Sequence, residues 1–264
     1  MPSRPPETAP GLRAVIFDVD GTLVDSERDG HRVAFNLAFA EFGLAYRWDD
    51  ELYGRLLAVT GGQRRLHGYL AEQGVGAAER EHLVPRLHAR KSELLFALAA
   101  DGKVPARAGT GRLLDSLAAA RVPVAVATTG SRSWVEPLLD RHFGLHRFAA
   151  VVTGDDTAEL KPHPEAYVLA LRLLAVPADA TVAVEDSDNG VQAALAAGLR
   201  VLAVTNDYTA GQDLAGAAVV VDGFGAPGRP AAAVRDPAGL LTDGQVDVAL
   251  LRRIAAHPHR ETHP

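Results

Sequence analysis

The sequence predicts an α/β fold in which a parallel sheet carries helices on both faces and an all-helical unit follows the first strand. Two observations indicate this. Strand and helix patterns alternate from residue 104 onward, as they do in a parallel sheet covered on both sides. Residues 50–100 hold only helical segments, separated by Gly61-Gly62 and Gly74-Val75-Gly76. A chain of 264 residues is long enough for one core domain with a smaller insertion.

The first two predicted elements are a strand, which precedes the helical unit, and a helix, which begins it. Residues 13–17, "RAVIF", form a short apolar run that ends at an aspartate, which is typical of a buried parallel strand. From about residue 26 to 43 the pattern is helical, and we expect Val33, Leu37 and Ala40 to share its apolar face.

The later elements follow in regular alternation. In chain order, the pattern predicts a helix over 110–121, a strand over 122–127, a helix from Ser133, a strand near 148–153, a helix from Pro164, a strand over 181–185, a helix over 189–197 and a strand over 200–205. Residues 223–239 are rich in Gly, Pro and Ala and are expected to be a linker before a last helix over 243–256.

Composition limits the possible partners. The net charge of −6 is spread without acidic or basic blocks, which argues against a nucleic-acid or membrane-surface protein. There are no cysteines, so disulfides and thiolate metal sites are excluded. No apolar run approaches the roughly 20 residues that cross a bilayer, and residues 1–10 are expected to be a disordered leader. We expect a cytoplasmic protein, a monomer by default, whose partner is a small molecule.

Polar residues with complementary chemistry follow four of the predicted strands. They are the segments 18–22, "DVDGT"; 128–131, "TTGS"; 161–164, "KPHP"; and 185–190, "EDSDNG". Each segment alone has a simple structural explanation, such as a capped turn or a solvated lysine. Ligands of open parallel sheets bind beyond the carboxyl ends of the strands, however, so these residues are expected to meet at one edge. Together they favour a phosphate site.

In these motifs the chain resembles the haloacid-dehalogenase superfamily of aspartate-dependent phosphatases and mutases. The four motifs of that family correspond here to "DVDGTL" at 18–23, Thr128, Lys161 and "EDS" at 185–187. The resemblance covers about residues 11–222.

The resemblance implies a domain organisation as well. It implies a Rossmann-like core made of residues 11–27 and 104–264, with an α-helical cap domain over 28–103 inserted after the first motif. This agrees with the helical block seen in the sequence pattern.

The residue types define a phosphoryl-transfer mechanism. Asp18 is the expected nucleophile, which forms an aspartyl-phosphate. Asp20 is expected to protonate the leaving oxygen and then to activate the hydrolytic water. Thr128, with Thr129 beside it, is expected to bind the phosphoryl oxygens, and Lys161 to neutralise charge.

Magnesium is the expected cofactor, because it prefers octahedral oxygen ligands. Asp18, the Asp20 backbone carbonyl and Asp186 suit Mg²⁺, and Glu185 is expected to be a further ligand.

A closer resemblance, to CbbY-type sugar-bisphosphate phosphatases, assigns residues of the cap. It is carried by "DSERDGHRVAFN" (25–36), "TGGQRR" (60–65) and "LHARKSELLF" (87–96). It implies that two residues bind the sugar and that five face a second, distal phosphate: Glu27 and His31 for the sugar, and Gly61, Gly62, Arg64, Arg65 and Lys91 for the phosphate. Of the two arginines, Arg65 matches the family better. Gln63 departs from it, because relatives commonly carry lysine there. A plain helix–helix turn with two solvated arginines is the alternative reading of 60–65.

We therefore expect a magnesium-dependent phosphatase for a sugar bisphosphate similar to xylulose 1,5-bisphosphate. A phosphosugar mutase of the β-phosphoglucomutase kind shares every core motif and stays an alternative. A catalytically silent binding protein of the same fold is a third possibility.

Overall fold

A seven-stranded sheet forms the centre of the structure, a computed structural model in which residues 11–257 are described. Its strand order is β3-β2-β1-β4-β5-β6-β7, and every pairing is parallel except that of β6 with β7. The strands are β1 (Ala14–Phe17), β2 (Val124–Ala127), β3 (Ala150–Val152), β4 (Thr181–Glu185), β5 (Arg200–Val204), β6 (Val219–Val221) and β7 (Ala233–Arg235). The mixed α/β fold with a mostly parallel sheet is as predicted.

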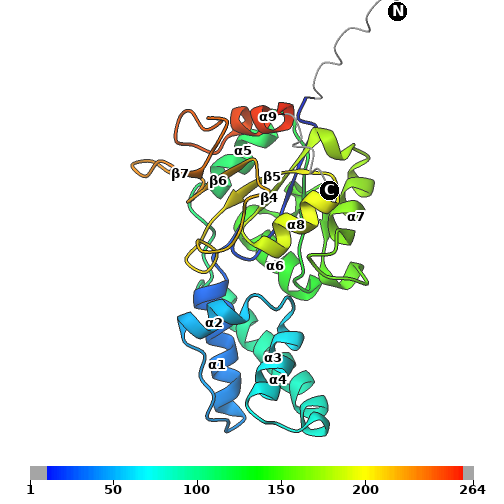
Figure 1. Cartoon of the computed structure of the whole chain (residues 1–264), viewed down its shortest axis with the longest axis vertical. Coiled ribbons are helices and arrows are strands. Elements are labelled where there is room, and N and C mark those ends of the chain that lie inside the picture. The colour runs from blue at the N-terminus through cyan, green and yellow to red at the C-terminus, as the bar shows by residue number, and fades with distance from the viewer. Residues whose placement is uncertain (1–10, 258–264) are drawn as a thin grey trace, which may run out of the picture.

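Helices cover both faces of this sheet (Figure 1). On one face lie α5 (Thr110–Ala119), α6 (Arg132–Phe143) and α9 (Val248–Ala256), and on the other lie α7 (Glu165–Leu174) and α8 (Asp188–Ala196). Alternate strand residues point to opposite faces, so "VAVA" of β2 sends its valines toward α6 and its alanines toward α7. The small alanines let α7 and α8 pack close to the strand ends that carry the site.

The helical unit lies beyond one edge of this layered core (Figure 1). It consists of η1 (Glu27–His31), α1 (Arg32–Glu41), α2 (Asp50–Leu56), α3 (Gly62–Glu72) and α4 (Ala77–Ala100). An aromatic cluster around Phe35, Phe39 and Trp48 gives it a hydrophobic core of its own. The predicted boundaries of the cap domain, residues 28 and 103, lie close to the start of η1 and the end of α4 and stay a prediction.

Two short chain segments join the helical unit to the sheet. Val24 pairs with Ala106 in an antiparallel bridge, and the Asp25 N–H donates to the Pro105 carbonyl at 2.9 Å. The chain therefore leaves and re-enters the core side by side, next to the first motif. Further short helices of the core are η2 (Leu145–Arg147), η3 (Gly154–Asp156) and η4 (Ala178–Ala180).

The predicted apolar face of α1 is wrong. Leu37 is 41% exposed, whereas Ala34, Phe35, Ala38 and Phe39 are buried. The aromatic pair at 35 and 39 is spaced i, i+4 and packs on Trp48, so the two large rings decide which face is buried.

The predicted linker over 223–239 is also wrong in part. It contains β7, which pairs antiparallel with β6, a strand that the sequence analysis missed. The predicted leader over 1–10 lies outside the described residues, as does the end of the chain from 258. Among residues 11–257, no helix combines the length and the apolar character needed to cross a membrane.

Candidate active site

Three carboxylates and one lysine meet beyond the carboxyl ends of β1 and β4. Lys161 donates from Nζ to Asp18 Oδ1 at 2.7 Å and to Glu185 Oε1 at 2.5 Å. Its side chain is only 4% exposed, and both carboxylates are also buried. Asp186 lies beside them and accepts a hydrogen bond from Asn206 Nδ2 at 2.7 Å. These side chains therefore lie together at one edge of the sheet, as expected for residues that follow parallel strands.

The carboxylate group fits a divalent cation. One oxygen from each of Asp18, Glu185 and Asp186 can be chosen so that all lie within 4.8 Å of one another. An all-oxygen donor set of this kind is what Mg²⁺ prefers. Gly21 leaves the necessary room, since a Cβ there would stand 2.3 Å from Asp186 Oδ2. The Asp20 side chain is directed elsewhere, so its predicted part in the metal site rests on its backbone carbonyl alone.

Three carboxyl groups and one lysine share this buried site. Burial raises the pKa of Asp18 to about 8, although the charge of Lys161 opposes the rise. Burial, together with the charges of Asp18 and Glu185, raises the pKa of Asp186 well above its usual range. Burial alone would lower the pKa of Lys161, but its two carboxylate partners outweigh this and raise it. Lys161 is therefore held charged, and a further cation at this place would favour the ionised forms of Asp18 and Asp186.

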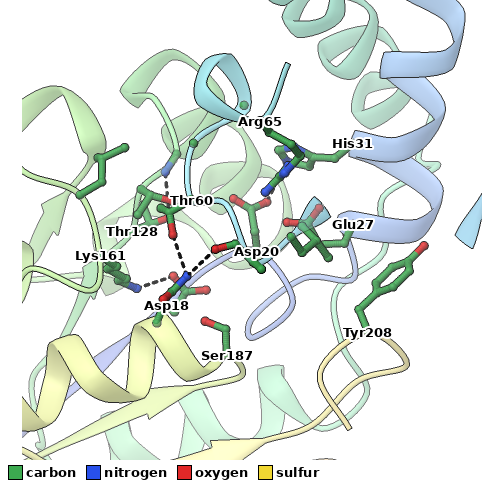
Figure 2. Close-up of a pocket in the computed structure, with 18 of the residues that line it drawn as sticks. Asp18, Asp20, Glu27, His31, Thr60, Arg65, Thr128, Lys161, Ser187 and Tyr208 are labelled. Carbon is green, nitrogen blue, oxygen red and sulfur yellow. Dashed lines mark hydrogen bonds and ion pairs between the residues drawn. The ribbon is translucent and has the colours of Figure 1, made fainter. Parts of the chain in front are cut away.

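A turn after β2 presents hydroxyl and amide groups to the same place. Thr128 is buried, and its Oγ1 accepts a hydrogen bond from the Gly130 N–H at 3.1 Å. Thr129 and Gly130 line the cavity beside it. Figure 2 shows Thr128 close to Asp18 and Lys161 on the core side of the cavity. These positions suit the binding of phosphoryl oxygens.

Asp20 faces the helical unit. Its Oδ1 accepts hydrogen bonds from Ser26 Oγ at 2.5 Å, His31 Nε2 at 3.2 Å and Trp134 Nε1 at 3.2 Å. Burial would raise the pKa of Asp20, but His31 and the hydrogen bonds outweigh it and lower this pKa to about 2. The Asp20 side chain therefore points away from the carboxylates around Lys161. Its pKa is lowered, whereas those of Asp18 and Asp186 are raised.

Glu27, His31 and Lys91 come from the helical unit and line the same cavity (Figure 2 labels the first two). Tyr53 donates to Glu27 Oε2 at 2.6 Å. Lys91 Nζ lies 2.9 Å from His31 Nδ1, while His31 Nε2 contacts Asp20. An ammonium group can only donate hydrogen bonds, so Lys91 donates to His31 Nδ1, and the ring proton that faces Asp20 is on Nε2. His31 and Lys91 therefore reach Asp20 as a chain, a contact that the sequence analysis did not foresee.

Lys91 makes the stability of the protein depend on pH in the alkaline range. Burial lowers the pKa of Lys91 to about 8, in spite of the charges of Glu27 and Asp20. The usual value is about 10.4, so between these values the unfolded chain binds more protons than the folded one. Stability therefore gains a contribution as pH rises through this window. Relative to Lys91→Met, we expect the unfolding free energy of the wild type to rise from pH 8 to 10.5, by at most about 1.4 kcal/mol per unit.

Denaturant unfolding of both proteins at several pH values measures this difference. Lys103 is exposed, so Lys103→Met serves as the matched control and is expected to give no such slope. A wild-type-minus-variant difference that is flat with pH would contradict the burial argument.

The segment at 60–65 forms the start of α3 and a wall of the cavity. Gly61 has a φ of +92°, a conformation that favours glycine, and the helix begins at the next residue. A Cβ at Gly62 would stand 2.7 Å from His88 Nε2, so the close approach there is to a side chain of α4. The first helical N–H groups of α3 have no acceptor within the helix, which leaves them for a ligand.

The two arginines of this segment differ. Arg65 is buried and donates to the carbonyls of Leu56 at 3.0 Å and Val59 at 3.2 Å and to Tyr53 Oη at 3.4 Å. These contacts use three of its five N–H donors and hold the turn in place. Arg64 is exposed, lines the cavity and has no hydrogen-bond or ion-pair partner among residues 11–257. Arg65 thus has a structural part that the sequence analysis did not predict.

The helical unit is seated against the sheet across the cavity. Asn189, at the start of α8, donates from Nδ2 to Thr60 Oγ1 at 3.0 Å. Tyr208, in the loop after β5, donates to Asp50 Oδ1 at 2.8 Å. The cavity between them is open to solvent and has a volume of about 990 Å³, which is large enough for a sugar bisphosphate.

The sequence analysis missed several side chains that contact these carboxylates, among them Ser26, Asn206, Tyr167 and Trp134. Asn206 lies two residues beyond the end of β5, so the same strand-end rule could have found it. Tyr167 lies within α7 and donates to Glu185 Oε1 at 2.6 Å, and Trp134 lies within α6. An aromatic residue inside a helix carries no sequence signal of such a contact.

The chain is similar to known proteins in sequence and in fold. A family profile for haloacid dehalogenase-like hydrolases matches residues 12–198. The chain is 38% identical to the plasmid-encoded CbbY of Cupriavidus necator, over 83% of this chain and 88% of that protein. It is 41% identical to CbbY of Cereibacter sphaeroides, over 81% of this chain and 93% of that protein. A crystal structure of mutant CbbY from Rhodobacter sphaeroides in complex with xylulose-(1,5)bisphosphate is similar as well, with a TM-score of 0.74, 39% identity, and 81% of this chain and 95% of that chain covered.

Proposed function

We propose that this chain, which belongs to the haloacid dehalogenase-like hydrolases and is a phosphatase, removes one phosphate from a ketopentose bisphosphate such as xylulose 1,5-bisphosphate. One observation carries this proposal. The Asp18 carboxylate, paired with Lys161 and two residues from Asp20, lies in a cavity whose opposite wall holds Arg64 and the start of α3. The relatives named CbbY, one of them bound to xylulose bisphosphate, support the choice of substrate.

Asp18 is the nucleophile in this proposal. Its carboxylate oxygen forms a bond to phosphorus while the bond from phosphorus to the sugar oxygen breaks, which gives an aspartyl-phosphate. Asp20 is ionised in the free protein, so it has to take up a proton from solvent when the anionic substrate binds beside it. It gives this proton to the departing sugar oxygen, and then takes a proton from the water that hydrolyses the aspartyl-phosphate. Lys161 and Thr128 hold the phosphoryl oxygens and balance their charge.

The donor set of Asp18, Glu185, Asp186 and the Asp20 carbonyl is proposed to hold Mg²⁺. When bound, the ion supplies positive charge that neutralises the phosphoryl oxygens and the excess of carboxylates. Lys161 keeps Asp18 and Glu185 in position through its two hydrogen bonds.

Residues 28–103 act as a cap in this proposal and select the substrate. Arg64 and the first amides of α3, among them that of Gly62, bind the distal phosphate. Gly61 gives the backbone the positive φ that starts this turn, and Arg65 fixes the turn and adds its remaining donors. Glu27, His31 and Lys91 face the sugar between the two phosphates. The contact of Asn189 with Thr60 keeps the cap closed over the cavity.

Phosphate release with Mg²⁺ from a substrate panel tests the proposal. The panel contains xylulose 1,5-bisphosphate, ribulose 1,5-bisphosphate, fructose 1,6-bisphosphate and β-glucose 1-phosphate. We expect xylulose 1,5-bisphosphate to be preferred and Arg64→Gln to raise its KM about tenfold or more, since a charge-assisted bond to phosphate is lost. The KM for the monophosphate is expected to stay within about twofold, because that substrate has no distal phosphate.

Arg90 provides the matched control, since it is a cap arginine that pairs with Glu41 and Glu93 on the surface. Arg90→Gln is expected to leave both KM values unchanged. Equal rates on all four substrates would contradict the bisphosphate proposal. Conversion of β-glucose 1-phosphate to an isomer without free phosphate would instead identify a mutase.

A further inference from the structure

Trp134 lies where the core, the cap and Asp20 meet, and the proposed mechanism gives it no part. It belongs to α6, packs in the hydrophobic core on that face of the sheet and is only 4% exposed. Its indole N–H donates to Asp20 Oδ1 at 3.2 Å. Its ring also meets two rings of the helical unit edge to face, His31 at 5.5 Å and Phe96 at 5.9 Å between centroids.

The three donors to Asp20 Oδ1 differ in where they are anchored. Ser26 stands on the segment that enters the helical unit, and His31 belongs to that unit. Trp134 is held by the sheet and by α6, as Asp20 is held by the loop after β1. The indole is therefore the donor of the three that stands on a helix packed against the sheet.

The second oxygen of Asp20 is left for chemistry. Oδ2 has no hydrogen-bond partner within the described part of the chain. Gly130, which lines the cavity, keeps the space beside it open, because a Cβ there would lie 3.4 Å from Oδ2, 3.3 Å from the Trp134 ring and 2.9 Å from Val135. Since Oδ1 is held by donors, Oδ2 is the oxygen that can carry a proton to a leaving group.

We propose that Trp134 is a positioning residue of the reaction, whose indole N–H fixes Asp20 Oδ1 from the core and thereby directs Oδ2 at the leaving oxygen. This inference rests on the proposed function. In the first half-reaction, the proton that Oδ2 has taken up on substrate binding moves to the sugar oxygen as the bond between that oxygen and phosphorus breaks, and Oδ1 keeps its three donors. The ring contacts with His31 and Phe96 seat the cap on the same indole that orients Asp20.

Leaving-group dependence tests this role. A sugar oxygen is strongly basic and needs a proton as it departs, whereas 4-nitrophenolate leaves without one. The ratio kcat/KM covers only the steps up to the first irreversible one, here the transfer of phosphate to Asp18. In Trp134→Phe, which keeps an aromatic ring but lacks the N–H, we expect kcat/KM for the sugar bisphosphate to fall about tenfold or more. With 4-nitrophenyl phosphate it is expected to change by less than about twofold.

Trp48 is the matched control. It is the chain's other tryptophan, is fully buried in the cap, and its Nε1 has no partner within residues 11–257. Trp48→Phe is expected to leave the ratio of the two kcat/KM values unchanged. Because Trp134→Phe also removes ring volume, a second variant carries the sulfur isostere of tryptophan, 3-benzothienylalanine, at position 134, and it is expected to give the same selective loss.

The possible results distinguish a positioning role of Trp134 from a packing role. A loss with the sugar substrate alone, in both variants at position 134, supports the positioning role. An equal loss with both substrates, or no loss in the isostere, overturns it and leaves Trp134 as a packing residue. If the wild type hydrolyses neither substrate with Mg²⁺, the proposed function fails and not this inference alone.

Discussion

Asp18→Asn is expected to abolish phosphate release, with a loss on the order of 10⁴-fold or more. The amide cannot attack phosphorus as the carboxylate does, so no aspartyl-phosphate forms. The variant should still fold, because an amide oxygen can accept the hydrogen bond that Lys161 now donates to Asp18 Oδ1 at 2.7 Å. Phosphate release from the bisphosphate, followed at saturating Mg²⁺, measures the loss.

Two controls make this result specific to the nucleophile. Binding of the bisphosphate to Asp18→Asn, measured by calorimetry, is expected to persist, because the cap residues and Lys161 remain. Acid-quenched wild-type protein is expected to retain phosphate from labelled substrate, and the variant to retain none. Labelled phosphate in the variant, or turnover within about tenfold of the wild type, would contradict a nucleophilic Asp18.

The core of the site was predictable because strand ends gather by topology alone. Once the chain pattern indicates a parallel sheet, the residues after β1, β2 and β4 must meet at one edge, whatever the details of packing. Asp18, Thr128 and Asp186 were found in this way, and the predicted strand 181–185 has the bounds of β4. The rule holds equally for Asn206 after β5, which was overlooked although it contacts Asp186.

The cap was harder to predict because its geometry depends on packing between helices. The choice of Leu37 for the buried face failed, since aliphatic spacing gave no hint that Phe35 and Phe39 would pack on Trp48. The burial of Arg65 follows from its hydrogen bonds to the carbonyl of Leu56, the last residue of α2, and to that of Val59 in the turn that follows. Sequence spacing predicts which residues share a helix, but not which backbone groups a long side chain can reach.

Other residues of the site were not predicted because they reach the carboxylates from distant parts of the chain. Trp134 reaches Asp20 from α6 and Tyr167 reaches Glu185 from α7, each from the interior of a helix that covers the sheet. Their positions follow from how α6 and α7 pack on opposite faces, and a motif search confined to loops cannot detect them. The missed strands β6 and β7 are short, with three residues each, which leaves little periodic pattern to detect.

Lys161→Met is expected to lower both activity and stability. The side chain that is lost is 4% exposed and holds Asp18 and Glu185 at 2.7 and 2.5 Å. Without it, buried carboxylates lose their cation, and breaking a buried ion pair from one side costs roughly 3–5 kcal/mol of unfolding free energy. Phosphate release should fall by about 10²–10³-fold, since charge that faces the phosphoryl group is removed.

Magnesium distinguishes this electrostatic cause from a loss of packing. Methionine fills a volume close to that of lysine, so the deficit is one of charge, and a divalent cation among Asp18, Glu185 and Asp186 can compensate for part of it. We therefore expect Mg²⁺ to raise the denaturation midpoint of Lys161→Met more than that of the wild type. Lys103→Met, at an exposed position, should stay within about 0.5 kcal/mol of the wild type with or without the ion. If Mg²⁺ stabilised Lys161→Met no more than the wild type, Lys161 would not be the charge that balances these carboxylates.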